Sequence, residues 1–154
     1  MKNNKQKNTG IVVYQAKSGA IELRGDFGKE TIWASQKQIA DVFNIERSVA
    51  TKHISNILKI KEVDQKSNVQ KMHIANSDKP VVYYSLDVIL AVGYRANSAR
   101  AIEFRQWATK TLRQYITQGF VINKKRIAEH YSEFQKVVED MKNLLSPRAI
   151  QNTN

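Results

Sequence analysis

The stretch SQKQIADVFNIERSVATKHISNILK, residues 35–59, decides the fold, because it reads as two short amphipathic helices separated by a tight corner. Ser35, followed three residues later by Gln38, is a capping box that predicts the start of the first helix. Asn44 suits the left-handed conformation that ends a helix, and Ser48 is the expected cap of the second helix. The inner faces predicted to be buried consist of Ile39, Ala40, Phe43, Ala50, Ile54 and Ile57.

The outer face of the second predicted helix is rich in basic and short polar side chains. It carries Arg47, Ser48, Thr51, Lys52 and Ser55. Arginine and lysine contact guanine or phosphate, and short hydroxyl side chains allow a helix to approach base edges closely. Such a helix pair is either an ordinary packing corner or the reading head of a helix-turn-helix protein, and spacing alone does not separate the two.

A second β-hairpin is predicted after the helix pair, because SNVQKMHIA and VVYYS flank the turn sequence NSDKP. Helix, corner, helix and hairpin in this order is the plan of a winged helix-turn-helix. The wing would present Lys71 and Lys79 to the DNA backbone. Before the helix pair, residues 11–16 and 20–24 predict a hairpin that turns at Ser18 and Gly19, and a third short strand is expected to end at Trp33.

Two further helices are predicted downstream. Ser85 is the expected cap of a helix over residues 86–93 that ends at Gly93, and Gly119 is expected to end a longer helix over 97–119. The predicted fold is therefore α+β: a winged helix-turn-helix with an N-terminal β-hairpin, followed by a helical region ending in a long amphipathic helix. The expected divisions are a disordered basic arm (1–10), a winged-helix-like domain with the hairpin (11–94), a helical region (95–146) and a flexible tail (147–154).

The last helical segment has a heptad pattern. Its apolar residues are separated by 4, 3, 4, 3 and 4 positions, and they are Ile127, Tyr131, Phe134, Val138, Met141 and Leu145. We expect this seam to pair two copies of the chain as a homodimer. Packing within the chain, or docking of a different helix, would fit the same pattern.

The net charge of +11 indicates a polyanionic partner, above all nucleic acid. The basic residues cluster in residues 1–17, 35–61 and 95–126 rather than mixing with acids. The candidate wing and phosphate contacts are Lys37, Lys71, Lys79, Arg95, Arg100, Arg105 and Arg113. The absence of cysteine excludes disulfides and thiolate metal sites and suits the cytoplasm, and no apolar run is long enough for a membrane span.

Two blocks resemble a known family. IWASQKQIADVFNIERSVATKHISNILK and YYSLDVILAVGYRANSARAIEFRQWATKTLRQYITQGFVIN are similar to the N-terminal part of the RhuM-type virulence-associated protein family of bacteria, over roughly residues 11–130. The resemblance implies a mobile-element or genomic-island origin and a DNA-binding N-terminal module. Asn44 stands where the family usually has glycine, and longer members continue beyond the end of this chain. The segment EFRQWATKTLRQYITQG is also distantly similar to phage antirepressor BRO-N domains.

The expected function is sequence-specific binding of double-stranded DNA by a dimeric transcriptional regulator. Arg47 and Thr51 are expected to set sequence preference, and Arg105 and Arg113 to set general affinity. The alternative is a protein–protein interaction module, an antirepressor or toxin-system partner, with only weak non-specific DNA contact. No catalytic motif is present, and we expect no enzymatic activity, cofactor, metal site or small-molecule substrate.

Overall fold

The β-prone residues near the N-terminus form an antiparallel hairpin, as the sequence predicts. Strand β1 (Thr9–Ala16) pairs with β2 (Gly19–Asp26), in a register that runs from Thr9 opposite Asp26 to Ala16 opposite Gly19. The computed structural model describes residues 9–16, 19–26 and 29–145. Most of the predicted arm (1–10) and the whole predicted tail (147–154) lie outside these ranges, and Thr9 and Gly10 belong to β1.

Within the described residues the strands form one sheet in the order β1-β2-β3-β5-β4. Strand β3 (Thr31–Ser35) pairs with β2 on one side and with β5 (Val81–Tyr84) on the other. Strand β4 (Val69–Met72) pairs with β5 in an antiparallel hairpin, which is the hairpin predicted after the helix pair. The α+β class and both hairpins are thus confirmed.

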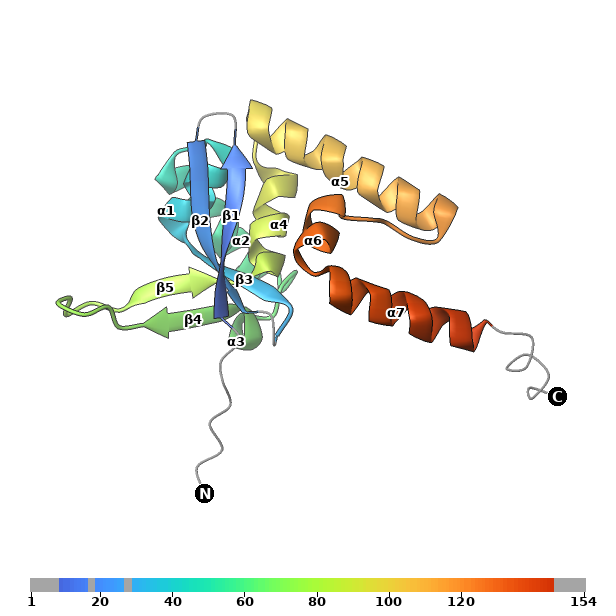
Figure 1. The fold of residues 1–154 in the computed structure, drawn as a ribbon. Helices are drawn as coiled ribbons and strands as arrows, with labels where there is room; N and C mark the ends of the chain where they lie inside the picture. Colours follow the sequence, from blue (N-terminus) through green and yellow to red (C-terminus); the bar gives the residue numbers. More distant parts are fainter. Residues whose placement is uncertain (1–8, 17–18, 27–28, 146–154) are drawn as a thin grey trace, which may run out of the picture. The chain divides into compact units, whose positions relative to one another are not determined.

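The chain divides into two compact units, Met1–Thr109 and Lys110–Asn154. In the first unit the helices are α1 (Gln36–Phe43), α2 (Arg47–Lys59), α3 (Gln65–Asn68), α4 (Leu86–Arg95) and the first part of α5 (Ala99–Gln118). Helices α1, α2 and α4 pack together beside the sheet (Figure 1). None of the helices in the described residues has both the length and the apolar content needed to cross a bilayer.

The core of the first unit forms where the predicted inner faces of α1 and α2 meet α4. All six predicted inner residues of the helix pair are buried. The largest fully buried side chains are Ile39, Ile54, Ile57, Val88 and Val92. Burial of each such side chain stabilises the fold by about 1.5–3 kcal/mol, so this apolar junction fixes α2 against α1 and α4.

The corner between α1 and α2 follows the predicted local chemistry with one exception. The Ser35 side chain accepts from Gln38 N, and the Gln38 side chain accepts from Ser35 N, which completes the capping box. Asn44 is left-handed, with φ 50°. Ser48 is not the cap of α2, because the helix begins at Arg47 and its N-cap is Glu46, whose side chain makes no capping hydrogen bond. Ile45 N donates to the Ala40 carbonyl, and this tight corner starts α2 earlier than the serine predicts.

The predicted N-cap position of α4 is confirmed, whereas its expected capping hydrogen bond and its predicted end are corrected. Ser85 occupies the N-cap position, but its hydroxyl donates to Asn68 Oδ1 (2.7 Å), and Thr31 Oγ1 accepts from Leu86 N (3.1 Å) instead. Gly93 does not end α4, which continues to Arg95. It is buried inside the helix because Phe43 and Phe104 occupy the space that a side chain there would fill.

In the second unit the predicted amphipathic helix is divided into α6 (Lys124–Glu129) and α7 (Tyr131–Leu144). His130 separates them with a non-helical backbone, φ −126° and ψ 43°. Ile127 therefore lies on α6, whereas four seam residues lie on α7 and Leu145 is its C-cap. Neither glycine nor proline marks this break, so the heptad spacing gave no sign of it.

Replacement of Gly93 by alanine is expected to destabilise the first unit. A Cβ at this position would lie 2.5 Å from Phe104 Cε1 and 2.8 Å from Phe43 Cζ. Because both rings are packed against the core, we expect a loss of about 1–3 kcal/mol in the free energy of unfolding, measured by urea denaturation. A decrease in the free energy of unfolding would itself indicate the close packing, because replacement of glycine by alanine inside an ordinary helix is stabilising by about 1 kcal/mol.

The matched control is Gln106→Ala, at an exposed position of α5, which should change stability by less than about 0.5 kcal/mol. A Gly93→Ala protein as stable as the parent would contradict this packing.

Candidate nucleic-acid interface

Helix α2 presents an outward stripe of polar and basic residues. Ser48, Lys52, Ser55 and Lys59 recur at i, i+4, i+7 and i+11, and all four are exposed. The buried face of the same helix holds Ala50, Ile54 and Ile57, which fixes the direction in which the outer stripe points. These four side chains of the predicted recognition helix are therefore not covered by the rest of the first unit.

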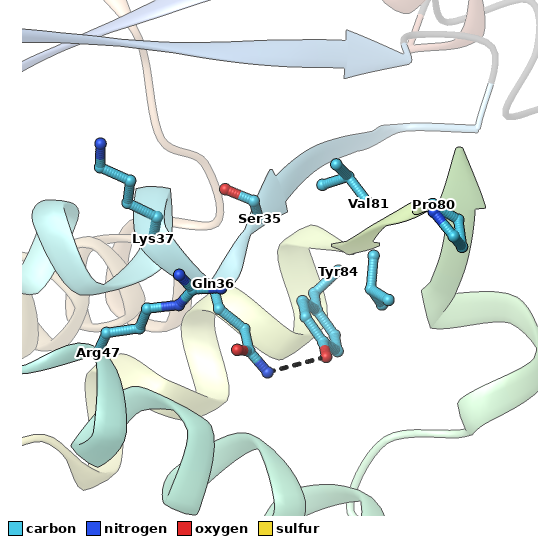
Figure 2. Close-up of a pocket in the computed structure, with 8 residues that line it drawn as sticks. Ser35, Gln36, Lys37, Arg47, Pro80, Val81 and Tyr84 are labelled. Atoms are coloured by element: carbon cyan, nitrogen blue, oxygen red, sulfur yellow. Dashed lines mark hydrogen bonds between the residues drawn. The ribbon is translucent and has the colours of Figure 1, made fainter. Parts of the chain in front are cut away.

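Arg47 and Thr51 lie on a neighbouring row of α2, one step closer to α1. Arg47 is exposed, but Thr51 is half-buried, and its hydroxyl lies 3.1 Å from Gln36 Oε1 and 2.9 Å from the Arg47 carbonyl. Gln36 Nε2 in turn donates to the Tyr84 hydroxyl at 3.3 Å (Figure 2). Thr51 is thus part of a polar bridge that joins α2, α1 and β5 through Gln36.

A groove of about 400 Å³ lies beside this bridge, and we call it the α1–β5 groove. Its lining includes Gln36, Lys37, Arg47, Pro80, Val81 and Tyr84. Figure 2 shows Lys37 and Arg47 on the side of the helices, whereas Pro80 and Val81 lie on the opposite side. The sequence pattern identified Lys37 and Arg47 separately, but it gave no sign that the fold brings them to one groove with an apolar opposite wall.

The two predicted wing lysines are both exposed. Lys71 lies in β4, opposite Val82 of β5, and Lys79 lies in the loop that joins the two strands. This loop turns through Asn76, which has φ 68°, and Ser77 Oγ donates to the Lys79 carbonyl at 3.2 Å. A second groove, of about 770 Å³, is lined by Lys71 together with Lys61 and Lys66, two lysines that the sequence analysis did not single out.

Three of the four predicted phosphate-contacting arginines have partners inside the first unit. Arg95 forms an ion pair with Glu62 at 2.9 Å. Arg100 Nη1 donates to the Asp41 carbonyl (2.6 Å), near the end of α1.

Arg105 Nη1 donates to the carbonyls of Gly93 (3.0 Å) and Ala96 (2.7 Å), at the end of α4. Arginine is favourable at such positions because the last carbonyls of a helix lack intrahelical partners and carry partial negative charge. Arg113, the fourth arginine, is exposed on the part of α5 that belongs to the second unit. Some of the basic residues between 95 and 126 therefore make contacts within the fold. The charge pattern of the sequence does not distinguish such residues from those of a binding surface.

His53, on α2, adds little to the positive charge of this region at neutral pH. Burial lowers its pKa below the ordinary 6.5, and the nearby Arg95 and Lys52 cations lower it further. A lowered folded-state pKa favours the neutral imidazole, so this group opposes folding as the pH falls below 6.5. The positive charge of α2 at neutral pH therefore comes from its arginine and its lysines.

The six predicted dimerisation residues show two degrees of exposure. Ile127, Phe134 and Val138 are half-buried, and Tyr131, Met141 and Leu145 are exposed, the last at 74%. No residue between 110 and 145 is buried.

In the part of the chain that the structure describes, no group of three or more histidine, aspartate or glutamate side chains is placed to hold a metal ion.

Comparison with known proteins places the chain in a protein family. The model of a family described as "Virulence protein RhuM family" matches residues 59–149, more than half of the chain. The match begins at the last residue of α2, so it includes the β4–β5 hairpin, α4 and α5 but not α1. No curated protein and no solved structure matches the chain, and nothing in these comparisons bears on the similarity to antirepressor domains.

Replacement of Arg105 by alanine is expected to reduce stability, because two carbonyls at the end of α4 lose their donor. We expect a loss of about 1–3 kcal/mol in the free energy of unfolding, measured by urea denaturation followed by circular dichroism. Arg113→Ala, at an exposed position of the same helix, is the control and should leave stability unchanged. Equal stability of the two variants would show that the Arg105 hydrogen bonds do not support the fold.

Proposed function

This chain belongs to the RhuM family of virulence proteins, and we propose that it is a sequence-specific double-stranded DNA-binding protein that regulates transcription from a bacterial mobile element or genomic island. The observation that carries the proposal is the exposed stripe of Ser48, Lys52 and Ser55 on a helix whose opposite face is locked into the core. A helix presented in this way fits the major groove, which is about 12 Å wide.

We interpret the segment from β3 to β5 as a winged helix. Strand β3 precedes α1 and α2, the β4–β5 hairpin follows them, and β3 pairs with β5 within one sheet. In this interpretation α2 is the recognition helix and the hairpin is the wing. The family model matches the chain only from Lys59 onward, so it does not cover α2 before its last residue. The assignment of α2 as the recognition helix therefore rests on its exposed stripe and on its place before the hairpin.

The proposed contacts divide by their chemistry. Ser48, Lys52 and Ser55 face base edges, where hydroxyl and ammonium groups donate to purine acceptors. Lys37, Lys71 and Lys79 contact phosphates, and exposed Arg113 adds a further one. No step of this function calls for catalysis, a metal or a cofactor.

We further propose that the protein binds DNA as a homodimer through the second unit. A helix of 14 residues such as α7 is marginal by itself in water, and its stability in proteins comes from packing of its apolar face. Since no residue between 110 and 145 is buried, the seam residues Phe134, Val138 and Met141 need a partner surface. A second copy would supply this surface and would pair two recognition helices for two half-sites.

The alternative is a protein–protein interaction module, an antirepressor or toxin-system partner. It is favoured by the exposed apolar residues near the end of α5, where Ile116 is 76% and Tyr115 is 61% exposed. Contiguous exposed apolar patches on a protein surface often mark sites where another protein binds. In that case the basic surface would give only weak, non-specific DNA contact.

Selection from a pool of random duplexes is expected to enrich one sequence, and affinity for it should fall steeply as salt rises. Lys52→Ala should reduce the discrimination between the enriched and a scrambled duplex by about 1–3 kcal/mol, measured by fluorescence anisotropy. Lys136→Ala, at an exposed position of α7, is the control and should keep the full discrimination. No enriched sequence, with binding lost at moderate salt, would instead favour the interaction module.

The homodimer is tested by sedimentation equilibrium. The parent protein should have twice the chain mass of 17.7 kDa, and Val138→Asp should restore the single-chain mass, because a carboxylate in an apolar interface is strongly unfavourable. Gln135→Asp introduces the same charge at an exposed position of α7 and should remain dimeric. A parent protein of single-chain mass at micromolar concentration would contradict the proposed dimer.

A further inference from the structure

We propose that the α1–β5 groove holds one sugar–phosphate segment of a DNA strand, with Lys37 and Arg47 together binding a single phosphate and Pro80 and Val81 contacting the adjoining deoxyribose. The inference rests on the proposed function and deepens it. It changes the role expected of Arg47 from reading a base to binding the backbone.

The helix side of the groove has the charge that a phosphate requires. Lys37 comes from the first turn of α1 and Arg47 from the first residue of α2, and both side chains are exposed. Among the described residues, neither side chain has an ion-pair or hydrogen-bond partner. No acidic residue lines the groove. An arginine fork and a lysine point charge are the groups that proteins use together on phosphate oxygens.

The opposite side of the groove is apolar and stiff. Pro80 is exposed and Val81 is half-buried at the start of β5, and both line the groove on the side opposite Lys37 and Arg47 (Figure 2). Proline has a fixed φ and no backbone donor, so this wall offers a rigid hydrocarbon surface. A cationic wall facing an apolar wall matches a sugar–phosphate segment, which is anionic at the phosphate and mostly C–H at the sugar.

The pairing of β3 with β5 brings the two walls together, and Gln36 links them. Its side-chain amide joins the Tyr84 hydroxyl of β5 to the Thr51 hydroxyl of α2, at 3.3 Å and 3.1 Å. The bridge therefore favours one separation between β5 and α2, which the packed core already holds near each other. A DNA strand bound in the groove would have α2 on one side and the β4–β5 hairpin on the other.

The position of Arg47 on α2 agrees with this assignment. The exposed stripe proposed to read bases consists of Ser48, Lys52 and Ser55, whereas Arg47 shares its row with Thr51, which is turned toward Gln36. A guanidinium that binds phosphate in the groove fixes the register of α2 on the duplex without reading sequence.

The test measures affinity by fluorescence anisotropy at several salt concentrations, for the enriched and a scrambled duplex. Arg47→Ala and Lys37→Ala should each weaken both duplexes equally, by roughly 10–100-fold for the arginine, and loss of both cations should lower the salt slope by about 1. Because both cations bind one phosphate, the double variant should lose less than the product of the two single losses. The pair Lys29→Ala/Lys136→Ala, exposed cations remote in sequence from the groove, is the control.

A neutral methylphosphonate placed at one backbone position at a time locates the phosphate. At the position that occupies the groove, the parent protein should fall to the affinity of the Lys37→Ala/Arg47→Ala double variant, and that double variant should lose nothing further. A set of positions that weakens the parent and the double variant equally throughout would overturn the proposal.

The outcomes separate the groove from the general function. A parent protein without salt-dependent duplex binding would refute the proposed function itself. A parent that binds, while the groove variants lose no more than the control pair, would refute the groove and leave DNA binding intact. Loss of preference between the two duplexes in Arg47→Ala would mean that this residue reads a base, and would also refute the assignment.

Discussion

The burial of one apolar junction among α1, α2 and α4 determines which face of α2 is exposed. Ile39, Ile54 and Val88 are fully buried there, and each contributes about 1.5–3 kcal/mol, whereas a typical hydrogen bond between neutral groups contributes about 0.5–1.5 kcal/mol. Since α2 commits one face to this junction, its opposite face has to point outward. The Gln36 bridge is too weak to hold the helices by itself, but it selects one separation between the packed elements.

The basic residues of the described chain fall into two groups, those with partners inside the fold and those that are exposed. Arg100 and Arg105 donate to carbonyls at the ends of α1 and α4, and Arg95 pairs with Glu62. These side chains stabilise the arrangement of helices. The exposed cations that remain on α1, α2 and the β4–β5 hairpin include Lys37, Arg47, Lys52, Lys71 and Lys79. The proposed DNA-binding surface is therefore smaller than the net charge suggests, and it is concentrated on the elements around the helix corner.

The second unit differs from the first in its apolar residues. They recur at heptad spacing, but none of the residues from 110 to 145 is buried. Leu144 and Leu145 are 73% and 74% exposed, and Phe134 is only half-buried. Such helices gain most of their stability from a surface to pack against. A partner copy would couple the ordering of this unit to the pairing of two recognition helices, which is the physical reason that we connect dimerisation with DNA binding.

The sequence by itself determined what depends on neighbouring residues. The capping box at Ser35, the left-handed Asn44, the helix end at Gly119 and the apolar faces of α1 and α2 were all predicted, because each follows from hydrogen bonds or side-chain spacing within one or two turns. Both hairpins were predicted because β-prone residues flank a short run of turn residues, which is also a local pattern.

Only the tertiary structure decided what depends on residues far apart in the chain. Gly93 was expected to end a helix, but it lies inside α4 because Phe43 and Phe104 pack over it. Arg105 was singled out only as a phosphate contact, and the carbonyls to which its Nη1 donates, 9 and 12 residues away, were not predicted. The groove between Lys37 and Pro80 exists because β3 and β5 pair across the helix corner. A local pattern records which groups a residue can offer, and the packing of distant segments decides which partner each group meets.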